Sequence, residues 1–253
     1  MRYFTLFVLT LLLWNCSEEA SIEKADITLT FKGVYEGTPL TMLSDAYAYE
    51  DGMNLKFQLI QYYLSDLTLS QKNTVDGVHK LVDIASINFG EMYTENLALE
   101  GLQITIPDIP VGNYDELQYG LGVAPDLNAT SPADYEIGHP LSDNYWSWAM
   151  GYVFFKIEGN ADLEGQGDFA EKLTFHIGTN EMYRAVSVTG NFDHSLDQPL
   201  ELTFELDVHE LLVDDGGQYL NFRETPIDHT NDRALGNKLA DNLVKAVQIY
   251  RYQ

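Results

Sequence analysis

The sequence predicts an all-β protein, an antiparallel β-sandwich with a short C-terminal helix. Apolar and polar residues alternate with period two in about eight separate segments, and this alternation is typical of half-buried strands. Clusters of Gly, Asn and Asp between many of these segments favour turns. Because short strands joined by regular turns are the pattern of a sandwich, we expect two packed sheets.

The predicted strands follow one another along the chain. The first begins at Ile27, where residues 27–31 alternate apolar and polar side chains. Residues 55–69 are long enough for a bent or two-part strand, and Pro107 is expected to stop the strand over 102–106. The remaining strands are expected at 114–123, 152–157, 172–177, 185–188 and 200–208.

The chain is predicted to close with a helix that packs on the sandwich or caps one end. Its apolar stripe at helical spacing consists of Leu235, Leu239, Leu243, Ala246 and Val247. No shift of composition marks a domain linker. We therefore expect one domain over residues 27–253.

Residues 1–15 are predicted to be a signal peptide. A charged start at Arg2 precedes an apolar run that ends at Trp14, and this run is too short to span a bilayer. Cys16 is the sole cysteine, so no intrachain disulfide can form, and residues 13–16 resemble a bacterial lipobox, although Asn15 is bulkier than usual there. The following segment, Ser17-Glu18-Glu19, resembles the acidic export tag of Bacteroidetes surface lipoproteins.

We therefore expect Cys16 to be lipidated, residues 16–26 to be a tether, and the protein to be a lipoprotein of the outer membrane or cell surface. An ordinary signal peptide with an incidental cysteine remains the alternative. A formal charge of −25, from 39 acidic and 14 basic residues, excludes nucleic acid as a partner and restricts membrane contact to the lipid anchor. The acidic surface favours cations but also serves solubility.

The common enzyme motifs are absent from the sequence, so we expect no catalytic activity. It has no phosphate-binding glycine loop, no Gly-x-Ser-x-Gly elbow, no His-Glu-x-x-His helix and no EF-hand loop. Acidic loops at 126–128 and 213–216 are explained by ordinary turn chemistry as well as by calcium.

The most unusual stretch is 139–152, which contains His139 and both tryptophans that follow the signal, Trp146 and Trp148. An aromatic plug in the sandwich core is the structural alternative for these tryptophans. In the strand over 172–177, His176 faces away from its apolar neighbours Phe175 and Ile177. Two histidines that converge on one site would suit copper or zinc.

Four motifs in order give the chain a family resemblance. It resembles the MbnP-like (CorA-like) copper-binding proteins over roughly residues 26–250. The segments that carry the resemblance are Tyr62-Tyr63-Leu64-Ser65-Asp66-Leu67-Thr68-Leu69, Ile109-Pro110-Val111-Gly112-Asn113-Tyr114-Asp115-Glu116-Leu117, Trp146-Ser147-Trp148-Ala149-Met150-Gly151-Tyr152 with Lys156-Ile157-Glu158-Gly159, and Phe175-His176-Ile177-Gly178.

The resemblance implies a β-sandwich protein of the periplasm or cell surface that binds one copper through histidines and a tryptophan oxidised to kynurenine. It also implies a modifying partner, a di-haem enzyme related to cytochrome c peroxidases. Carried over by motif, the metal ligands are His176 and His139, with either Trp146 or Trp148 as the modified residue. The aniline nitrogen of kynurenine would add a third nitrogen ligand to a soft site suited to Cu(I).

The other histidines have structural explanations. His79 lies in a predicted turn, His194 in another, and His209 ends a strand. His229 stands between Asp228 and Thr230, either of which could cap or lead the last helix, so a metal role for it stays open.

The leading hypothesis is a lipoprotein that captures or presents copper. A second hypothesis is a module that binds an envelope protein or glycan through its aromatic loop. It predicts that Trp148→Ala abolishes partner binding whereas His176→Ala does not. A third, an enzyme with a metal-bound water, would use Asp143 or Glu158, which no spacing singles out.

Overall fold

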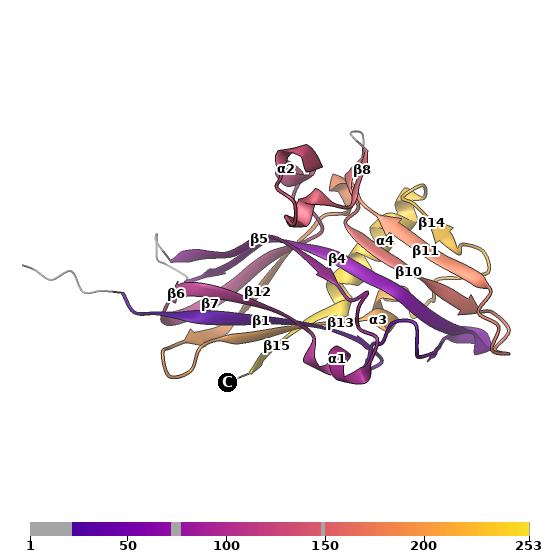
Figure 1. Cartoon of the computed structure of the whole chain (residues 1–253), viewed down its shortest axis with the longest axis horizontal. Coiled ribbons are helices and arrows are strands. Elements are labelled where there is room, and N and C mark those ends of the chain that lie inside the picture. Colours follow the sequence, from indigo (N-terminus) through magenta and orange to yellow (C-terminus); the bar gives the residue numbers. More distant parts are fainter. Residues whose placement is uncertain (1–21, 72–76, 148–149, 253) are drawn as a thin grey trace, which may run out of the picture.

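The computed structural model describes residues 22–71, 77–147 and 150–252, and it confirms the all-β sandwich (Figure 1). The predicted signal peptide, Cys16 and Trp148 lie outside these residues. Strand β1 begins at Lys24, ahead of the predicted start at Ile27. None of the described helices is long and apolar enough to cross a membrane.

The first sheet is built around β1, which pairs with β13, β2 and β6, while β15 pairs with the far side of β13. The β1–β13 pairing is parallel and the others are antiparallel, so the sheet is mixed. Its strands are β1 (Lys24–Tyr35), β2 (Thr38–Pro39), β6 (Leu102–Pro110), β13 (Glu201–Asp207) and β15 (Val247–Tyr252).

The second sheet follows the order β12-β7-β4-β10-β11-β14, and β3 and β5 also pair with β4. All pairings are antiparallel except β11–β14 at one edge. Its strands are β3 (Tyr47–Ala48), β4 (Asn54–Ser70), β5 (Val78–Asn88), β7 (Gly112–Leu121), β10 (Phe155–Asp162), β11 (Glu171–Ile177), β12 (Arg184–His194) and β14 (Ile227–Asp228).

A two-stranded hairpin and several short helices lie outside the two main sheets. The hairpin pairs β8 (Tyr145–Ser147) with β9 (Gly151–Tyr152). The α-helices are α1 (Glu95–Glu100), α2 (Pro125–Asn128), α3 (Val208–Leu212) and α4 (Arg233–Ala246). The 3-10 helices are η1 (Glu50–Gly52), η2 (Pro132–Asp134), η3 (Pro140–Ser142) and η4 (Asn180–Met182).

One apolar core lies between the two sheets. Phe204 of β13 meets Tyr119 of β7 edge-on at 5.6 Å between ring centroids, and Tyr35 of β1 meets Phe57 of β4 at 6.1 Å. These ring contacts join one sheet to the other, and the buried residues of both sheets form a single cluster. The alternation of apolar and polar residues in the sequence therefore predicts correctly which face of each strand points into the core.

Pro107 does not stop β6, contrary to the prediction. The strand continues to Pro110 because its pairing with β1 slips between Ala25 and Ile27, opposite the proline. Asp108 adopts a left-handed conformation there (φ 60°), and its amide donates to Asp26. A proline is tolerated at such an irregularity because no ladder hydrogen bond is required of it.

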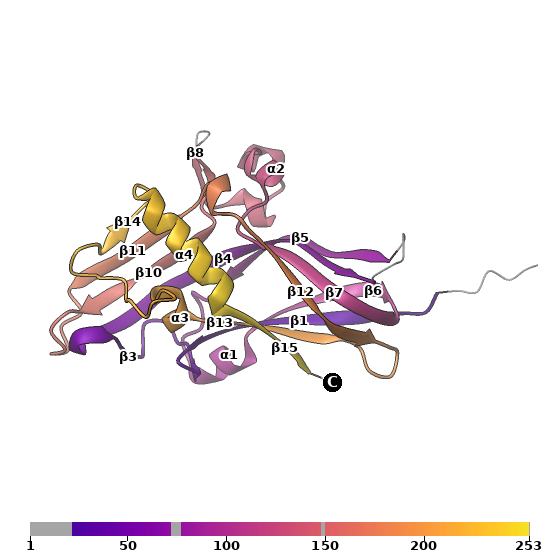
Figure 2. The same cartoon turned by 180° about the vertical axis from the view of Figure 1, so that it is seen from behind.

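The predicted C-terminal helix is present as α4, and the strand β15 follows it. Helix α4 buries Leu239, Leu243 and Ala246, but Val247 already belongs to β15, which pairs with the edge of β13. The cap of α4 is Asp232, whose side chain accepts from the amides of Ala234 and Leu235, and neither Asp228 nor Thr230 fills that role. Figure 2 shows α4 on the near side of the sandwich, with β14 beside one end.

Candidate metal centre

The outer face of β10 and β11 carries the polar side chains of the candidate site. Phe155 and Ile157 of β10 are buried, so Lys156 and Glu158 point to the opposite face. On β11, Phe175 and Ile177 are buried and His176 lies on that same outer face, opposite Lys156 in the antiparallel register. The prediction from alternation is thus confirmed for the direction of His176.

Strand β14 brings His229 next to His176. It pairs in parallel with β11, aligning Thr174 with Ile227 and Phe175 with Asp228, so His229 follows at the level of His176. The two imidazole rings stack, with centroids 4.8 Å apart and planes 16° from parallel. Residues far apart in the sequence therefore form a pair of histidines at a sheet edge.

The neighbours of His229 fix its position. The carboxylate of Asp228 is buried and accepts from the amides of Thr230, Asn231 and Asp232. The hydroxyl of Thr230 donates to the carbonyl of His176 at 2.9 Å and accepts from the amide of Gly178 at 3.2 Å. Because the side chains of Asp228 and Thr230 are both held by these hydrogen bonds, the backbone of His229 has little conformational freedom.

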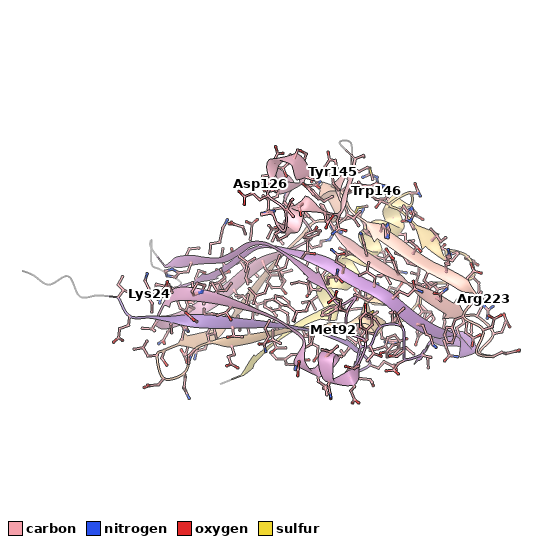
Figure 3. All side chains as sticks on the ribbon, in the orientation of Figure 1. Lys24, Met92, Asp126, Tyr145, Trp146 and Arg223 are labelled. Carbon is pink, nitrogen blue, oxygen red and sulfur yellow. The ribbon has the colours of Figure 1, made fainter. Side chains whose placement is uncertain are left out.

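The hairpin of β8 and β9 brings a tryptophan to the histidine pair. The indole of Trp146 meets His229 edge-on, with ring centroids 5.9 Å apart and an interplanar angle of 80°. Figure 3 labels Tyr145 and Trp146 at the top of the view, where the hairpin stands above the sheet. The site thus combines His176 of β11, His229 directly after β14, and Trp146 of the β8–β9 hairpin.

A hydrogen-bonded network holds the start of this hairpin on the sheet. Asn144 donates to the hydroxyl of Tyr63 at 3.0 Å and accepts from Lys156, while Tyr63 donates to the carbonyl of Pro140 at 2.8 Å. The carbonyl of Asn144 also accepts from the amide of Val153. This network positions the residue that precedes β8, and with it the hairpin that carries Trp146.

Glu158 holds the ring of His176. Its Oε1 lies 2.7 Å from Nε2 of His176, and both side chains are partly buried. Burial lowers the pKa of the His176 imidazole from its ordinary value, and the hydrogen bond and charge of Glu158 act in the opposite direction. The lowered pKa favours the neutral ring, the form in which imidazole binds metals.

His229 has an unused ligand atom. Its Nε2 is buried and has no hydrogen-bond partner among the described residues. A buried polar atom without a partner is costly, and a bound ion would satisfy it. The donor set therefore fits a metal that prefers nitrogen.

In the orientation that the structure shows, the two rings cannot both bind the same ion. Stacked imidazoles direct their lone pairs along nearly parallel planes, so at least one ring must turn before both can bind a single ion. Among the residues that the structure describes, no three His, Cys, Asp or Glu side chains are grouped closely enough to hold a metal. A third ligand would thus come from another kind of side chain.

His139 lies apart from this pair in the contacts that the structure shows. Its ring stacks on Tyr135 with centroids 4.1 Å apart, and its Nδ1 accepts from the amide of Leu141 at the start of η3. These contacts give His139 a structural role as a cap. The structure therefore brings together His176 and Trp146 of the predicted residues, while Trp148 lies outside the described part.

The remaining histidines have partners of their own. His79 belongs to β5, not to a turn, and meets Tyr114 edge-on, because 78–88 forms a strand that the sequence did not predict. His209 belongs to α3 and contacts Tyr35 and Tyr219. His194 ends β12, where both ring nitrogens contact backbone groups.

Sequence reasoning did not place His229 beside His176, and it did not assign Glu158 to His176. The available signal was the run Asp228-His229-Thr230, in which two short polar residues flank a histidine and favour a tight backbone turn. The pairing itself is not visible in any local pattern. Strand β14 has two residues, and its partner β11 is distant in the chain.

The fold and this site define the class: a β-sandwich protein with two stacked histidines and a tryptophan hairpin at one sheet edge. The family model of MbnP matches residues 24–232, and the chain belongs to the MbnP family. This confirms the resemblance read from the four motifs.

A solved structure of an MbnP protein has the same fold. MbnP from Methylosinus trichosporium superposes on the chain with a TM-score of 0.56 at 14% sequence identity, covering 92% of this chain and 100% of that one. No curated protein matches the sequence.

Proposed function

We propose that the protein is an envelope lipoprotein that captures or presents copper, held by His176 and His229 beside the side chain of Trp146. This proposal replaces His139 of the sequence prediction with His229 as the second imidazole. The observation that carries it is the buried Nε2 of His229, which has no partner among the described residues and lies in a ring stacked on the imidazole of His176.

Copper suits this donor set better than the hard divalent cations. Neutral imidazole nitrogen binds copper and zinc, and copper binds most tightly in the first-row divalent series. The formal charge of −25 gives the protein a field that concentrates cations around it. Calcium and magnesium prefer oxygen ligands, which the histidine pair does not offer.

Oxidation of Trp146 to kynurenine would supply the third nitrogen, and Trp148 remains the alternative residue for this modification. The oxidation cleaves the indole C2–C3 bond and leaves one oxygen atom on each carbon, while two equivalents of peroxide are reduced to water. Hydrolysis of the resulting N-formyl group then releases formate and leaves an aniline nitrogen. We propose a di-haem enzyme of the cytochrome c peroxidase kind, acting with peroxide, as the source of both oxygens. The edge-on approach of Trp146 to His229 supports this choice of residue.

A lipid on Cys16 would anchor the domain in the outer membrane or at the cell surface. The described domain starts at β1, whose first residue is Lys24. The short polar stretch between Cys16 and β1 would keep the domain close to the membrane. In this arrangement the protein captures copper outside the cytoplasm and performs no chemistry on an organic substrate.

The test is a titration of the full-length protein with Cu(I) in competition with a colorimetric chelator. We expect one Cu(I) per chain and a loss of affinity of at least about 100-fold in His176→Ala and in His229→Ala, because each removes one of few ligands. The matched control is His139→Ala, which removes a histidine whose ring contacts Tyr135 and the amide of Leu141. It should bind as the wild-type protein does.

Mass spectrometry of the peptide that contains residues 146 and 148, from protein purified out of its native host, tests the modification. The expected product carries one kynurenine. A protein that binds no Cu(I) and carries two unmodified tryptophans would contradict the proposed function. A loss of binding in His139→Ala alone would restore the ligand pair predicted from the sequence.

A further inference from the structure

The contact between Glu158 and His176 determines which nitrogen of the ring is free. The two residues lie on neighbouring strands and on the same face, because Lys156 pairs with His176 and Glu158 pairs with Thr174. They are diagonal neighbours in the sheet, within reach for long side chains. The distance between Nε2 and Oε1 is 2.7 Å, in the range of a strong hydrogen bond.

A neutral imidazole has one nitrogen that donates and one that accepts. An ionised carboxylate can only accept, so Nε2 of His176 must carry the proton in this contact. The lone pair is then on Nδ1. The hydrogen bond thus selects one tautomer of His176 and fixes the rotation of its ring.

His229 differs from His176 in this respect. Its Nε2 has no hydrogen-bond partner among the described residues. Because His176 is held and Nε2 of His229 is not, the ring turn that a shared ion requires falls on His229. The other charged side chain beside His176, Lys156, is engaged with Asn144 and does not compete for Glu158.

We propose that Glu158 is a positioning residue of the metal centre, which presents Nδ1 of His176 to the copper ion by accepting a hydrogen bond from Nε2. This inference rests on the proposed function and deepens it, since it assigns the ligand atom. A carboxylate behind a metal-binding imidazole sets the ring orientation and raises the basicity of the ligand. Removal of such a partner costs about 10–100-fold in metal affinity.

The first measurement needs no metal. Long-range ¹H–¹⁵N NMR of the full-length protein, labelled with ¹⁵N at histidine, distinguishes a protonated from an unprotonated ring nitrogen. The metal-free wild-type protein should show His176 with the proton on Nε2, whereas Glu158→Ala should show a mixture of both tautomers. A wild-type spectrum with the proton on Nδ1 of His176 would overturn the proposal.

The second measurement adds Cu(I), which is diamagnetic and leaves the spectrum observable. We expect the metal-induced shift at Nδ1 of His176, and Cu(I) binding about 10–100-fold weaker in Glu158→Ala. Glu158→Gln should recover most of this loss, because the amide oxygen still accepts from Nε2. The matched control is Glu164→Ala, which removes an exposed glutamate whose ion pair is with Arg223.

The outcomes separate the two proposals. Wild-type affinity in Glu158→Ala, or a metal-induced shift at Nε2 of His176, would overturn the role of Glu158 while copper binding stands. If Glu158→Gln lost binding as completely as Glu158→Ala, Glu158 would be a ligand and not a positioning residue. If the wild-type protein took up no Cu(I), the proposed function would fail, and the metal-free spectrum would still decide the tautomer.

Discussion

Two histidines of this protein have a buried Nε2 atom but differ in how fully their hydrogen bonds are satisfied. His194 is 2% exposed. Its Nε2 lies 3.2 and 3.3 Å from the carbonyls of Ala25 and Ile109, and its Nδ1 accepts from the amide of Leu200 at 3.0 Å. In contrast, Nε2 of His229 is buried with no partner among the described residues.

The comparison shows that burial alone does not identify a metal ligand. His194 joins β12, β1 and β6 through backbone groups, so both nitrogens are used and none is free for an ion. His229 leaves a nitrogen free, next to a second imidazole and an indole. A histidine is a candidate ligand where a buried ring nitrogen lacks a hydrogen bond, and this criterion separates His229 from His194.

The largest expected effect is on stability. His194→Ala should lower the free energy of unfolding by about 2–4 kcal/mol, because it leaves the amide of Leu200 and two carbonyls buried without their partner. His229→Ala should cost no more than about 1 kcal/mol, since it removes a ring contact but no hydrogen bond of Nε2. Urea denaturation of both variants gives the measurement. If His229→Ala lowered the free energy of unfolding more than His194→Ala does, the distinction between a satisfied and an unsatisfied histidine would be wrong.

A smaller effect is expected where the tryptophan hairpin meets β11. A Cβ on Gly178 would lie 2.4 Å from the carbonyl oxygen of Tyr152 in β9, which is backbone and cannot yield easily. Gly178→Ala should therefore destabilise the protein by about 1–3 kcal/mol. It should also weaken Cu(I) binding by roughly tenfold if about 1.4 kcal/mol of that strain reaches the site.

Gly190→Ala is the control for this change, because its nearest neighbour is the ring of Phe192 at 3.3 Å, the end of a side chain that can shift. Thermal melting and the chelator competition report stability and affinity separately. Unchanged binding in Gly178→Ala would mean that the hairpin does not set the geometry of the histidine pair.

The smallest expected effect is on stability at acid pH, through the contact of Glu181 with helix α4, which follows His229 in the chain. Hydrogen bonds from Asn237 and Arg233 lower the pKa of Glu181 from its ordinary value of 4.5, and they join η4 to the first turns of α4. The stability from this contact is fully present above pH 4.5 and is lost as the pH falls through the lower folded-state value.

Thermal melts between pH 7 and pH 3 measure this effect. Glu181→Gln should flatten the pH dependence slightly and leave the melting temperature at pH 7 little changed, since the group is at the surface. A steeper acid transition in Glu181→Gln would show that the carboxylate is destabilising in the folded protein.

The sequence predicted the parts of the molecule that depend on local pattern. Alternation correctly gave the sandwich and the outward direction of His176, and the tryptophan motif led to Trp146, which lies beside the histidine pair. Strand β5 was missed, because the polar residues of 78–88 interrupt its alternation.

The second histidine could not be predicted in this way. His229 owes its position to a parallel pairing of two residues between β14 and β11, strands that are distant in the chain and leave no periodic signal. The contact of Glu158 with His176 likewise depends on the β10–β11 register. His139 was carried over from the family resemblance, but it stacks on Tyr135 four residues earlier and caps η3, local contacts that the alternation of apolar and polar residues does not reveal.

The most direct test of the central claim is a crystal structure of the Cu(I)-loaded protein, with the metal located by its anomalous scattering at the copper edge. We expect a single peak bound by Nδ1 of His176 and Nε2 of His229, with the side chain of residue 146 beside it. A peak bound by His139, or one distant from both His176 and His229, would contradict it.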